Sequence, residues 1–364
     1  MSFNLLKNPN RASSLEEARQ FCAEFCFIGS QPKYILGRNV YAECVAGQVN
    51  VSGFIDDYTN DKDYLGLPVL KLADVPKDAL VLNSAGGRPL SARKRLSEAG
   101  LRNLDYFSFY RLSGLSLIEM RFNEGFSEEY SANEEQYSWI YDLLQDQNSR
   151  DIFNKLVNFR LEYDLAYLEG FVCKEDAQYF EDFLNLDVND ETFIDVGGYD
   201  GFTSLEFIKR ARNYKAIHVF EPEPTNYQKC LNNLSAYSDI HVHNLALSRN
   251  KATMKIEVQG SGSRISGDGT VNINVVRLDD VLTDVDTPTF IKMDIEGEEI
   301  AALEGARNTI ATHHPRLAIS VYHKPSDFWK IPKLIFSIRD DYEVYMRHYT
   351  ECIYETVMFF VPKN

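Results

Sequence analysis

The stretch TFIDVGGYDGFTSLEF (residues 192–207) contains the pattern that decides the fold. An apolar run leads into Asp195, a turn follows, and residues 202–211 read as a helix. The turn contains three glycines: Gly197, Gly198 and Gly201. Glycine is costly in ordered structure, so this spacing predicts a close approach to the backbone, which we interpret as a ligand lying against the turn. A strand, a glycine-rich turn and a helix in this order are typical of a nucleotide-type cofactor site.

The next strand-like stretch, AIHVFEPEP (216–224), ends in Glu221. An acid at the end of the second strand is placed to accept both hydroxyls of a ribose. A dinucleotide would favour G-x-G-x-x-G after the first strand, whereas this turn begins with Asp195. A carboxylate is awkward beside a pyrophosphate and suits a cation. The electrostatics therefore favour S-adenosylmethionine, which carries an ammonium and a sulfonium and no phosphate.

Strand and helix patterns alternate at both ends of the chain. In the N-terminal part, strands are expected at 24–30, 49–57 and 79–87, and helices at 32–47 and 89–100. In the C-terminal part, strands are expected at 192–196, 216–221, 240–245, 289–294, 316–322, 342–349 and 355–362. The last two have no crossover helix between them, which predicts an antiparallel hairpin at a sheet edge.

Residues 134–168 between these parts are helical and rich in aromatic residues. Trp139, Ile140, Leu143 and Leu144 fall on one helical face, which we interpret as core packing. A second helix is expected after a cap at Asn148 and Ser149. These helices could also pack against a second subunit, so a homo-oligomer stays open.

The expected fold class is α/β. We expect a class I methyltransferase-like, Rossmann-like, doubly wound sheet with an antiparallel final hairpin, preceded by a smaller Rossmann-like α/β domain. The expected boundaries are 1–115 for the N-terminal domain, 116–185 for a helical connector and 186–364 for the catalytic domain.

The composition is that of a globular protein, since 44% of the 364 residues are hydrophobic and 25% are charged. The formal net charge of −16 disfavours nucleic acid and anionic membranes as partners. No stretch has the length of a membrane span, and the N-terminus lacks the apolar core of a signal peptide. The six scattered cysteines suit reduced thiols, so we expect a cytoplasmic protein.

Several further motifs occur in a fixed order after the glycine-rich turn. They are FIDVGGYDGFTS (193–204), VFEPEP (219–224), HNLALS (243–248), VVRLDDVL (275–282), IKMDIEGEE (291–299) and AISVYHKPSD (318–327). Through them, residues 134–362 resemble the FkbM-type S-adenosylmethionine-dependent methyltransferase family. The resemblance implies a class I methyltransferase fold and O-methylation of sugars or other hydroxyl-bearing metabolites and glycans.

The resemblance also implies roles for individual residues in cofactor binding. Asp195, Gly197 and Gly201 would line the methionine part of S-adenosylmethionine, and Glu221 would hold the ribose. The turn from Asn244 to Ala246 would lie near the adenine.

The N-terminal part has a likeness of its own, carried by FIGS, VSGFIDDY and LGLPVL within residues 27–70. These motifs resemble the Rossmann-like N-terminal domains of PglD-type sugar acyltransferases. The turn GSQPKY (29–34) lacks the usual second and third glycines, so we favour a scaffold over a nucleotide site. Asp56 is the residue that could hold a ribose there.

Candidates for proton chemistry cluster after the fourth C-terminal strand. Asp294 and Glu296 follow that strand, and His323 follows the fifth. An alcohol acceptor must lose a proton during methyl transfer, and His323 or Asp294 is the expected base. Asp294, Glu296 and His323 could instead hold a divalent metal that acidifies a sugar diol. The sequence shows no metal-specific spacing, so we favour catalysis without a metal.

The function that the sequence favours is S-adenosylmethionine-dependent O-methylation of a sugar, sugar nucleotide or glycan precursor, with a small-molecule or glycan hydroxyl as acceptor. Two alternatives come from other classes. One is a dinucleotide-dependent enzyme of sugar metabolism, and the other is a non-catalytic scaffold that retains the methyltransferase fold.

Overall fold

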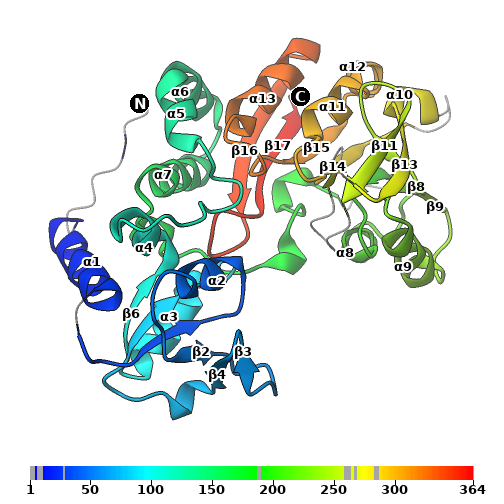
Figure 1. Cartoon of the computed structure of the whole chain (residues 1–364). Coiled ribbons are helices and arrows are strands. Elements are labelled where there is room, and N and C mark those ends of the chain that lie inside the picture. Colours follow the sequence, from blue (N-terminus) through cyan, green and yellow to red (C-terminus); the bar gives the residue numbers. More distant parts are fainter. Residues whose placement is uncertain are drawn as a thin grey trace.

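The computed structural model describes residues 5, 11–27, 29–186, 190–257, 264–265, 269–282 and 287–363. One β-sheet is built from the N-terminal part of the chain and a second from the C-terminal part, and the two lie at opposite ends of the molecule (Figure 1). Strands alternate with helices in both, so the expected α/β class is confirmed. Among the described residues, no helix combines the length and the apolar character that crossing a bilayer requires.

The N-terminal sheet has six strands in the order β3-β4-β2-β1-β5-β6. Its strands are parallel except β3, which pairs antiparallel with β4. The strands are β1 (Lys33–Leu36), β2 (Gly53–Ile55), β3 (Asp63–Tyr64), β4 (Leu67–Leu70), β5 (Leu80–Asn83) and β6 (Arg102–Asp105). The helices beside them are α1 (Arg11–Cys26), α2 (Val40–Ala46), η1 (Leu72–Asp74), α3 (Pro89–Glu98) and α4 (Tyr106–Leu112).

Two N-terminal predictions are wrong. The expected strand at 24–30 is not formed, since residues 24–26 are the last turn of α1, where Phe21 and Phe25 share a buried face at helical spacing. Residue 28 lies outside the described residues.

The expected helix at 32–47 is a strand followed by a helix. Gly37 ends β1 with a φ of +101°, and the Asn39 side chain caps α2 by accepting from the backbone N–H groups of Tyr41 and Ala42.

The C-terminal sheet has seven strands in the order β16-β17-β15-β14-β7-β8-β9. They are β7 (Thr192–Val196), β8 (Ala216–Phe220), β9 (Ile240–His243), β14 (Phe290–Met293), β15 (Arg316–Ser320), β16 (Tyr342–His348) and β17 (Thr356–Pro362). Strand β17 runs antiparallel to both neighbours, and β16 forms the edge. The seven expected strands and the antiparallel final hairpin are therefore confirmed.

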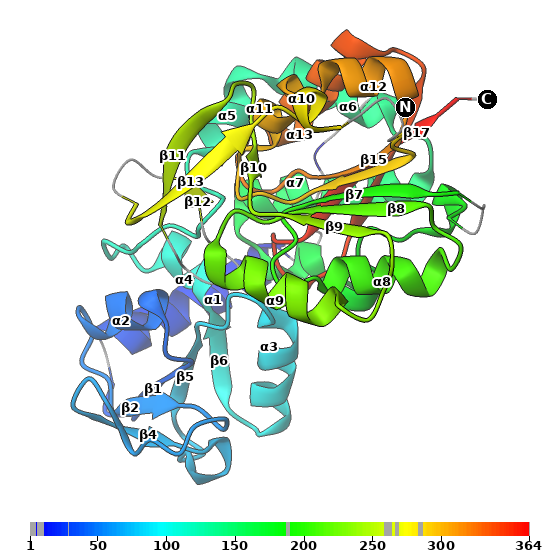
Figure 2. The same cartoon turned by 90° about the vertical axis from the view of Figure 1, so that its right-hand side faces the viewer.

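Helices cover both faces of this sheet, as a doubly wound fold requires (Figure 2). One face packs against α8 (Phe202–Arg210) and α9 (Pro224–Leu234). The other face packs against α10 (Leu278–Val281), α11 (Glu299–Glu304), α12 (Arg307–His313) and α13 (Asp327–Ile338). The part of the chain that follows β9 and precedes β14 forms a separate four-stranded sheet. Its strands are β10 (Ala246–Leu247), β11 (Ala252–Glu257), β12 (Arg264–Ile265) and β13 (Val271–Val276).

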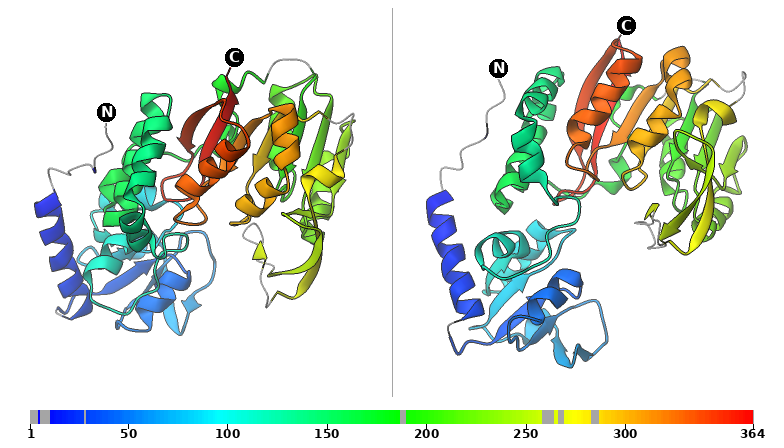
Figure 3. Two further views of the ribbon diagram at one scale, coloured as in Figure 1. Left: turned by 90° about the horizontal axis from the view of Figure 1, so that it is seen from above. Right: turned by 45° about the horizontal axis from the view of Figure 1, so that its top comes forward.

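The segment between the two sheets is helical, as expected. It contains α5 (Phe126–Ala132), α6 (Glu134–Leu143), α7 (Gln147–Glu162), η2 (Leu165–Leu168), η3 (Glu175–Ala177) and η4 (Asp182–Leu184). Ile140 and Leu144 are fully buried in one apolar cluster with the C-terminal sheet, which confirms core packing. The cap of α7 is Asp146, whose carboxylate accepts from the N–H of Ser149, rather than the expected Asn148–Ser149 pair. In two further views, α5–α7 lie beside β16, β17 and α13 (Figure 3).

The Arg160 side chain of α7 connects three segments that are distant in the sequence. Its guanidinium is buried and donates to the backbone carbonyls of Phe122, Tyr322 and Ile353. These residues belong to the connector, the end of β15 and the β16–β17 loop. Burial lowers the pKa of Arg160 to about 10, so the side chain stays charged at neutral pH.

We expect Arg160→Met to lower the free energy of unfolding by about 3 kcal/mol, because each buried carbonyl left without a donor costs about 1–3 kcal/mol. Urea denaturation measures this change. Arg307→Met, on the exposed face of α12, is the control and should change stability by less than about 0.5 kcal/mol. Equal effects of the two substitutions would contradict the role given to Arg160.

Candidate active site

The glycine-rich turn after β7 packs tightly against other parts of the protein. Gly197 has a φ of +83°, and a Cβ atom there would lie 2.0 Å from the backbone oxygen of Asp294. A Cβ on Gly198 would lie 2.2 Å from Val219 Cγ1, and one on Gly201 3.2 Å from Leu234. The expected close approach is therefore present, but protein atoms make it. Gly197 and Gly198 also line the larger cavity described below, so a ligand lying against this turn stays a prediction.

Asp195 lies beneath this turn and is fully buried. Lys292 Nζ donates to Asp195 Oδ1 at 3.1 Å, and Ser204 Oγ donates to Oδ2 at 2.7 Å. Lys292 also donates to the backbone oxygen of Gly197 at 2.7 Å. Both carboxylate oxygens thus have protein partners, and Asp195 lines neither of the cavities described below. Its role in this structure is to hold the turn, not to contact a ligand directly.

A narrow cleft runs along the ends of β7 and β8. Its apolar side is formed by Phe220, Leu245, Ala246, Leu247 and Ile256, and its polar side includes Glu221, Glu223 and Asn226. Its volume of about 90 Å³ is below the roughly 300–1,000 Å³ of most ligand sites, so its walls must separate to admit a nucleoside.

Glu221 is the central acid of this cleft. Its carboxylate accepts from the backbone N–H groups of Tyr199 at 2.8 Å and Glu223 at 2.9 Å. Burial raises the pKa of Glu221 to about 7. Asn244 does not line the cleft; its side-chain amide donates to the backbone oxygens of Glu221 and Pro222, both at 3.0 Å. Asn244 thus shapes the cleft, and Ala246 forms part of its wall.

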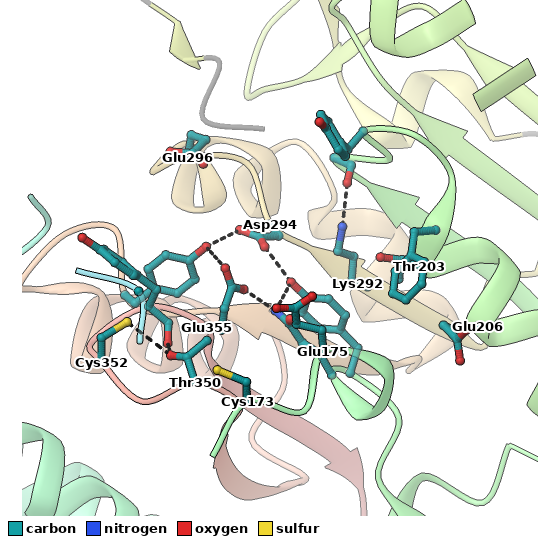
Figure 4. Close-up of a pocket in the computed structure, with 18 of the residues that line it drawn as sticks. Cys173, Glu175, Thr203, Glu206, Lys292, Asp294, Glu296, Thr350, Cys352 and Glu355 are labelled. Atoms are coloured by element: carbon teal, nitrogen blue, oxygen red, sulfur yellow. Dashed lines mark hydrogen bonds between the residues drawn. The ribbon is translucent and has the colours of Figure 1, made fainter. Parts of the chain in front are cut away.

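A larger cavity of about 630 Å³ opens between the N-terminal part and the ends of the C-terminal strands. It lies between loops from both parts of the chain (Figure 4). Gly87 and Arg88 come from the N-terminal part, and Arg121 comes from the connector. The cavity and the cleft share part of their walls. The shared residues are Gly197, Tyr199, Asp294 and Glu296.

A hydrogen-bonded network surrounds Asp294 in the larger cavity (Figure 4). The hydroxyl of Tyr179 donates to Asp294 Oδ2 at 2.6 Å, and the Tyr322 hydroxyl lies 3.3 Å from Oδ1. The Tyr322 hydroxyl is also 3.3 Å from Glu355 Oε1. Gln178 Nε2 donates both to the Tyr179 hydroxyl and to Glu355. Two carboxylates are thus held at the cavity by neutral donors.

His323 lies outside the cavity, and its side chain is fully buried. Its Nδ1 is 3.0 Å from Glu299 Oε1, and its Nε2 is 3.4 Å from Asp294 Oδ1. Burial alone would lower the pKa of His323, but the facing carboxylates outweigh burial and raise it to about 10. The ring is therefore an imidazolium at neutral pH and has no lone pair to accept a proton. The raised pKa of His323 and its position outside the cavity favour a carboxylate over this residue as the base.

Asp294, Glu299 and His323 offer ligand atoms that lie within 4.8 Å of one another, which is close enough to hold a metal ion. This set differs from the expected one, because Glu296 turns away towards Arg121, whose Nη2 donates to it at 3.0 Å. A metal-binding histidine usually donates its other ring N–H to a carboxylate, so the two carboxylates that face His323 fit either an imidazolium or a metal ligand.

Glu296 occupies the boundary between the cleft and the larger cavity. Its backbone has a φ of +58°, a conformation that non-glycine residues seldom adopt and that often marks functional sites. Burial raises the pKa of Glu296, while His323 and Arg121 act in the opposite direction. Of the three expected catalytic residues, Glu296 is the carboxylate best placed to accept a proton.

The sequence reasoning missed Gln178, Tyr179, Glu355 and Arg121. Tyr322 stood in the motif AISVYHKPSD without an assigned role. Gln178, Tyr179, Glu355 and Arg121 come from the connector and the β16–β17 loop and lie outside the six motifs that carry the resemblance. One feature of the sequence could have pointed to Glu355. It directly precedes the last strand, β17, which pairs with β15 and β16, and both of these strands end near the site.

Comparisons with known proteins agree with this geometry. Residues 195–354 match the family model described as the Methyltransferase FkbM domain, which confirms the expected resemblance. The chain is also similar to the crystal structure of Methyltransferase FkbM from Methylobacillus flagellatus KT, with a TM-score of 0.73, 26% identity, and coverage of 94% of this chain and 93% of that one. A search of curated proteins finds no match.

Weaker likenesses are found to other methyltransferase structures. An rRNA methylase from Streptococcus thermophilus has a TM-score of 0.33 and 14% identity, covering 50% of this chain and 93% of that one. A putative tRNA (m1A22) methyltransferase from Streptococcus pneumoniae, in complex with S-adenosyl-L-methionine, has a TM-score of 0.31 and 14% identity, covering 50% and 73%. The chain is thus similar to FkbM-type methyltransferases, over residues 195–354 by the family model and over most of its length by the first structure.

The buried imidazolium predicts a pH dependence of stability. The pKa of His323 is raised from 6.5 to about 10 on folding, so its charge adds stability that is complete below about pH 6.5 and is lost as the pH rises towards 10. We expect the excess free energy of unfolding of the wild type over His323→Gln, measured by urea denaturation, to be largest near pH 6 and to shrink at higher pH. An excess that is constant or grows with pH would mean a neutral ring.

Proposed function

We propose that this protein is an S-adenosylmethionine-dependent O-methyltransferase that acts on a hydroxyl of a sugar or glycan precursor. The observation that carries the proposal is the shared wall of the two cavities, where Glu296 and Asp294 line both the narrow cleft and the larger cavity. The FkbM domain match supports methyl transfer. The dependence on S-adenosylmethionine, the oxygen specificity and the carbohydrate acceptor are the proposed parts.

The cleft suits the adenosine end of S-adenosylmethionine. Glu221 offers carboxylate oxygens to ribose hydroxyls, and Leu245 and Ala246 offer apolar contacts to a purine. The methionine end would extend past Gly197 and Tyr199 into the larger cavity, where carboxylates favour its positive charges. When bound, this cofactor supplies a methyl group on a positively charged sulfur.

The chain's own residues would handle the acceptor and its proton. Glu296 accepts the proton of the acceptor hydroxyl, since it borders both cavities and its pKa is raised by burial. Asp294 is already held by Tyr179, Tyr322 and His323, so it orients the acceptor by hydrogen bonding. Positioning supplies most of the acceleration in such a reaction, and a placed base adds about 10²–10⁴-fold.

The N-terminal part would help to hold the acceptor. Gly87 and Arg88 line the larger cavity. The β16–β17 loop is tied to this part because the Glu351 carboxylate accepts from the N–H of Ser91, in the first turn of α3, at 2.7 Å. Asp56, the residue that could hold a ribose in this part, forms an ion pair with Arg38 at 2.9 Å, in line with the favoured scaffold. We propose that the N-terminal domain shapes the acceptor site rather than binding a nucleotide.

Titration calorimetry with S-adenosylmethionine tests the cofactor. We expect micromolar binding by the wild type and about 10–100-fold weaker binding by Glu221→Gln, because hydrogen bonds to a charged group contribute about 1.5–3 kcal/mol. Glu343→Gln, in strand β16 and away from both cavities, should bind like the wild type. Binding of NADH in place of S-adenosylmethionine would favour the dinucleotide alternative.

Single-turnover methyl transfer to an acceptor tests the base. We expect Glu296→Gln to lower the rate by about 10²–10⁴-fold while affinity for S-adenosylmethionine changes little. Glu304→Gln, at the other end of α11, should keep the wild-type rate. A near wild-type rate for Glu296→Gln would exclude this residue as the base.

A further inference from the structure

The larger cavity carries more acidic than basic side chains. Its acidic lining residues are Glu175, Asp200, Glu206, Asp294, Glu296 and Glu355. Its basic lining residues are Arg88, Arg121 and Lys292. All three of these cations already pair with carboxylates of the protein: Lys292 with Asp195, Arg121 with Glu296, and Arg88 with Glu175 at 3.5 Å. Arg88 lies at the rim with a side chain that is 65% exposed.

Glu355 is a buried acid of this cavity whose hydrogen-bond partners are neutral, namely Gln178 and Tyr322. Within the described residues, no lysine or arginine forms an ion pair with it. Burial raises the pKa of Glu355 to about 7, and the neighbouring Asp294 acts in the same direction, while the hydrogen bond from Gln178 and the charge of His323 act in the opposite direction. A carboxylate removed from water is stabilised when a cation pairs with it.

This charge distribution discriminates between classes of acceptor. A phosphate group in the cavity would face the carboxylates, and the three lining cations that could meet it are already paired, Arg88 with Glu175 at the exposed rim, which is unfavourable. An ammonium group could form a direct ion pair with Glu355. The sugar nucleotides among the expected acceptors therefore fit this cavity less well than acceptors without phosphate.

The position of Glu355 relative to the proposed reaction centre limits the acceptor further. The hydroxyl of Tyr322 lies 3.3 Å from a carboxylate oxygen of Asp294 and 3.3 Å from one of Glu355. The two acids are therefore close enough for one sugar-sized ligand to contact both. We propose that the acceptor is a polyhydroxylated amine, such as an amino sugar, whose ammonium group binds Glu355 while a hydroxyl of the same ring lies against Asp294 and Glu296. This assignment rests on the proposed methyltransferase function.

The test compares three matched probes in the full-length protein saturated with S-adenosylhomocysteine. The probes are D-glucosamine, N-acetyl-D-glucosamine and D-glucosamine 6-phosphate, each titrated by calorimetry. We expect glucosamine to bind at least about tenfold more tightly than the other two, which is about 1.4 kcal/mol. Equal or tighter binding of the acetylated or phosphorylated probe, or no binding of glucosamine, would overturn the proposal.

Two variants assign the preference to Glu355. Glu355→Gln keeps the shape and should lose the preference for glucosamine over its N-acetyl form, whereas Glu343→Gln should keep it. A preference retained by Glu355→Gln would overturn the assignment. Binding of S-adenosylhomocysteine is measured first in each protein, and it distinguishes a failure of the acceptor assignment from a failure of the proposed methyltransferase function. If the cofactor product binds and the amine preference is absent, only this inference fails; if the cofactor product does not bind, the proposed function fails.

Discussion

The buried ammonium of Lys292 is the constraint on which the site depends. It neutralises Asp195 and donates to the backbone oxygens of Val196 and Gly197, so one side chain from β14 holds the glycine-rich turn after β7. Removing one partner of a buried pair leaves an uncompensated charge, which is strongly destabilising. The same contact brings Gly197 against the backbone of Asp294. The cleft and the acidic wall of the larger cavity are thus joined through this turn.

The acids near this turn differ in the charged groups that surround them, and so in the roles that they suit. His323 stays an imidazolium between Glu299 and Asp294, which supplies Asp294 with a buried counter-charge. Glu296 has a raised pKa and borders both cavities, and these properties suit proton transfer. The hydrogen bonds to Glu355 come from the neutral groups of Gln178 and Tyr322, which suits binding of a charged ligand. Environments that separate the protonation of neighbouring carboxyl groups are a general means of dividing catalytic roles.

Much of the fold and part of the site could be predicted from the sequence. Alternating strands and helices predict parallel pairing, and parallel strands bring Glu221 and Asp294 to one edge of the sheet although they are distant in the sequence. The roles of Asp195 and His323 could not be predicted, because their partners come from other elements and decide whether a group is buried and charged. Glu355 was missed for the same reason. The end of α1 was misread because a short apolar run fits a strand and a buried helix equally well.

A crystal structure with S-adenosylhomocysteine is the most direct test of the central claim, that the two cavities meet at a methyl-transfer site. The account predicts the ribose against Glu221, the adenine beside Ala246, and the sulfur at the shared wall near Asp294 and Glu296. A nucleoside bound at the ends of the N-terminal strands, or a sulfur atom facing away from the larger cavity, would contradict it.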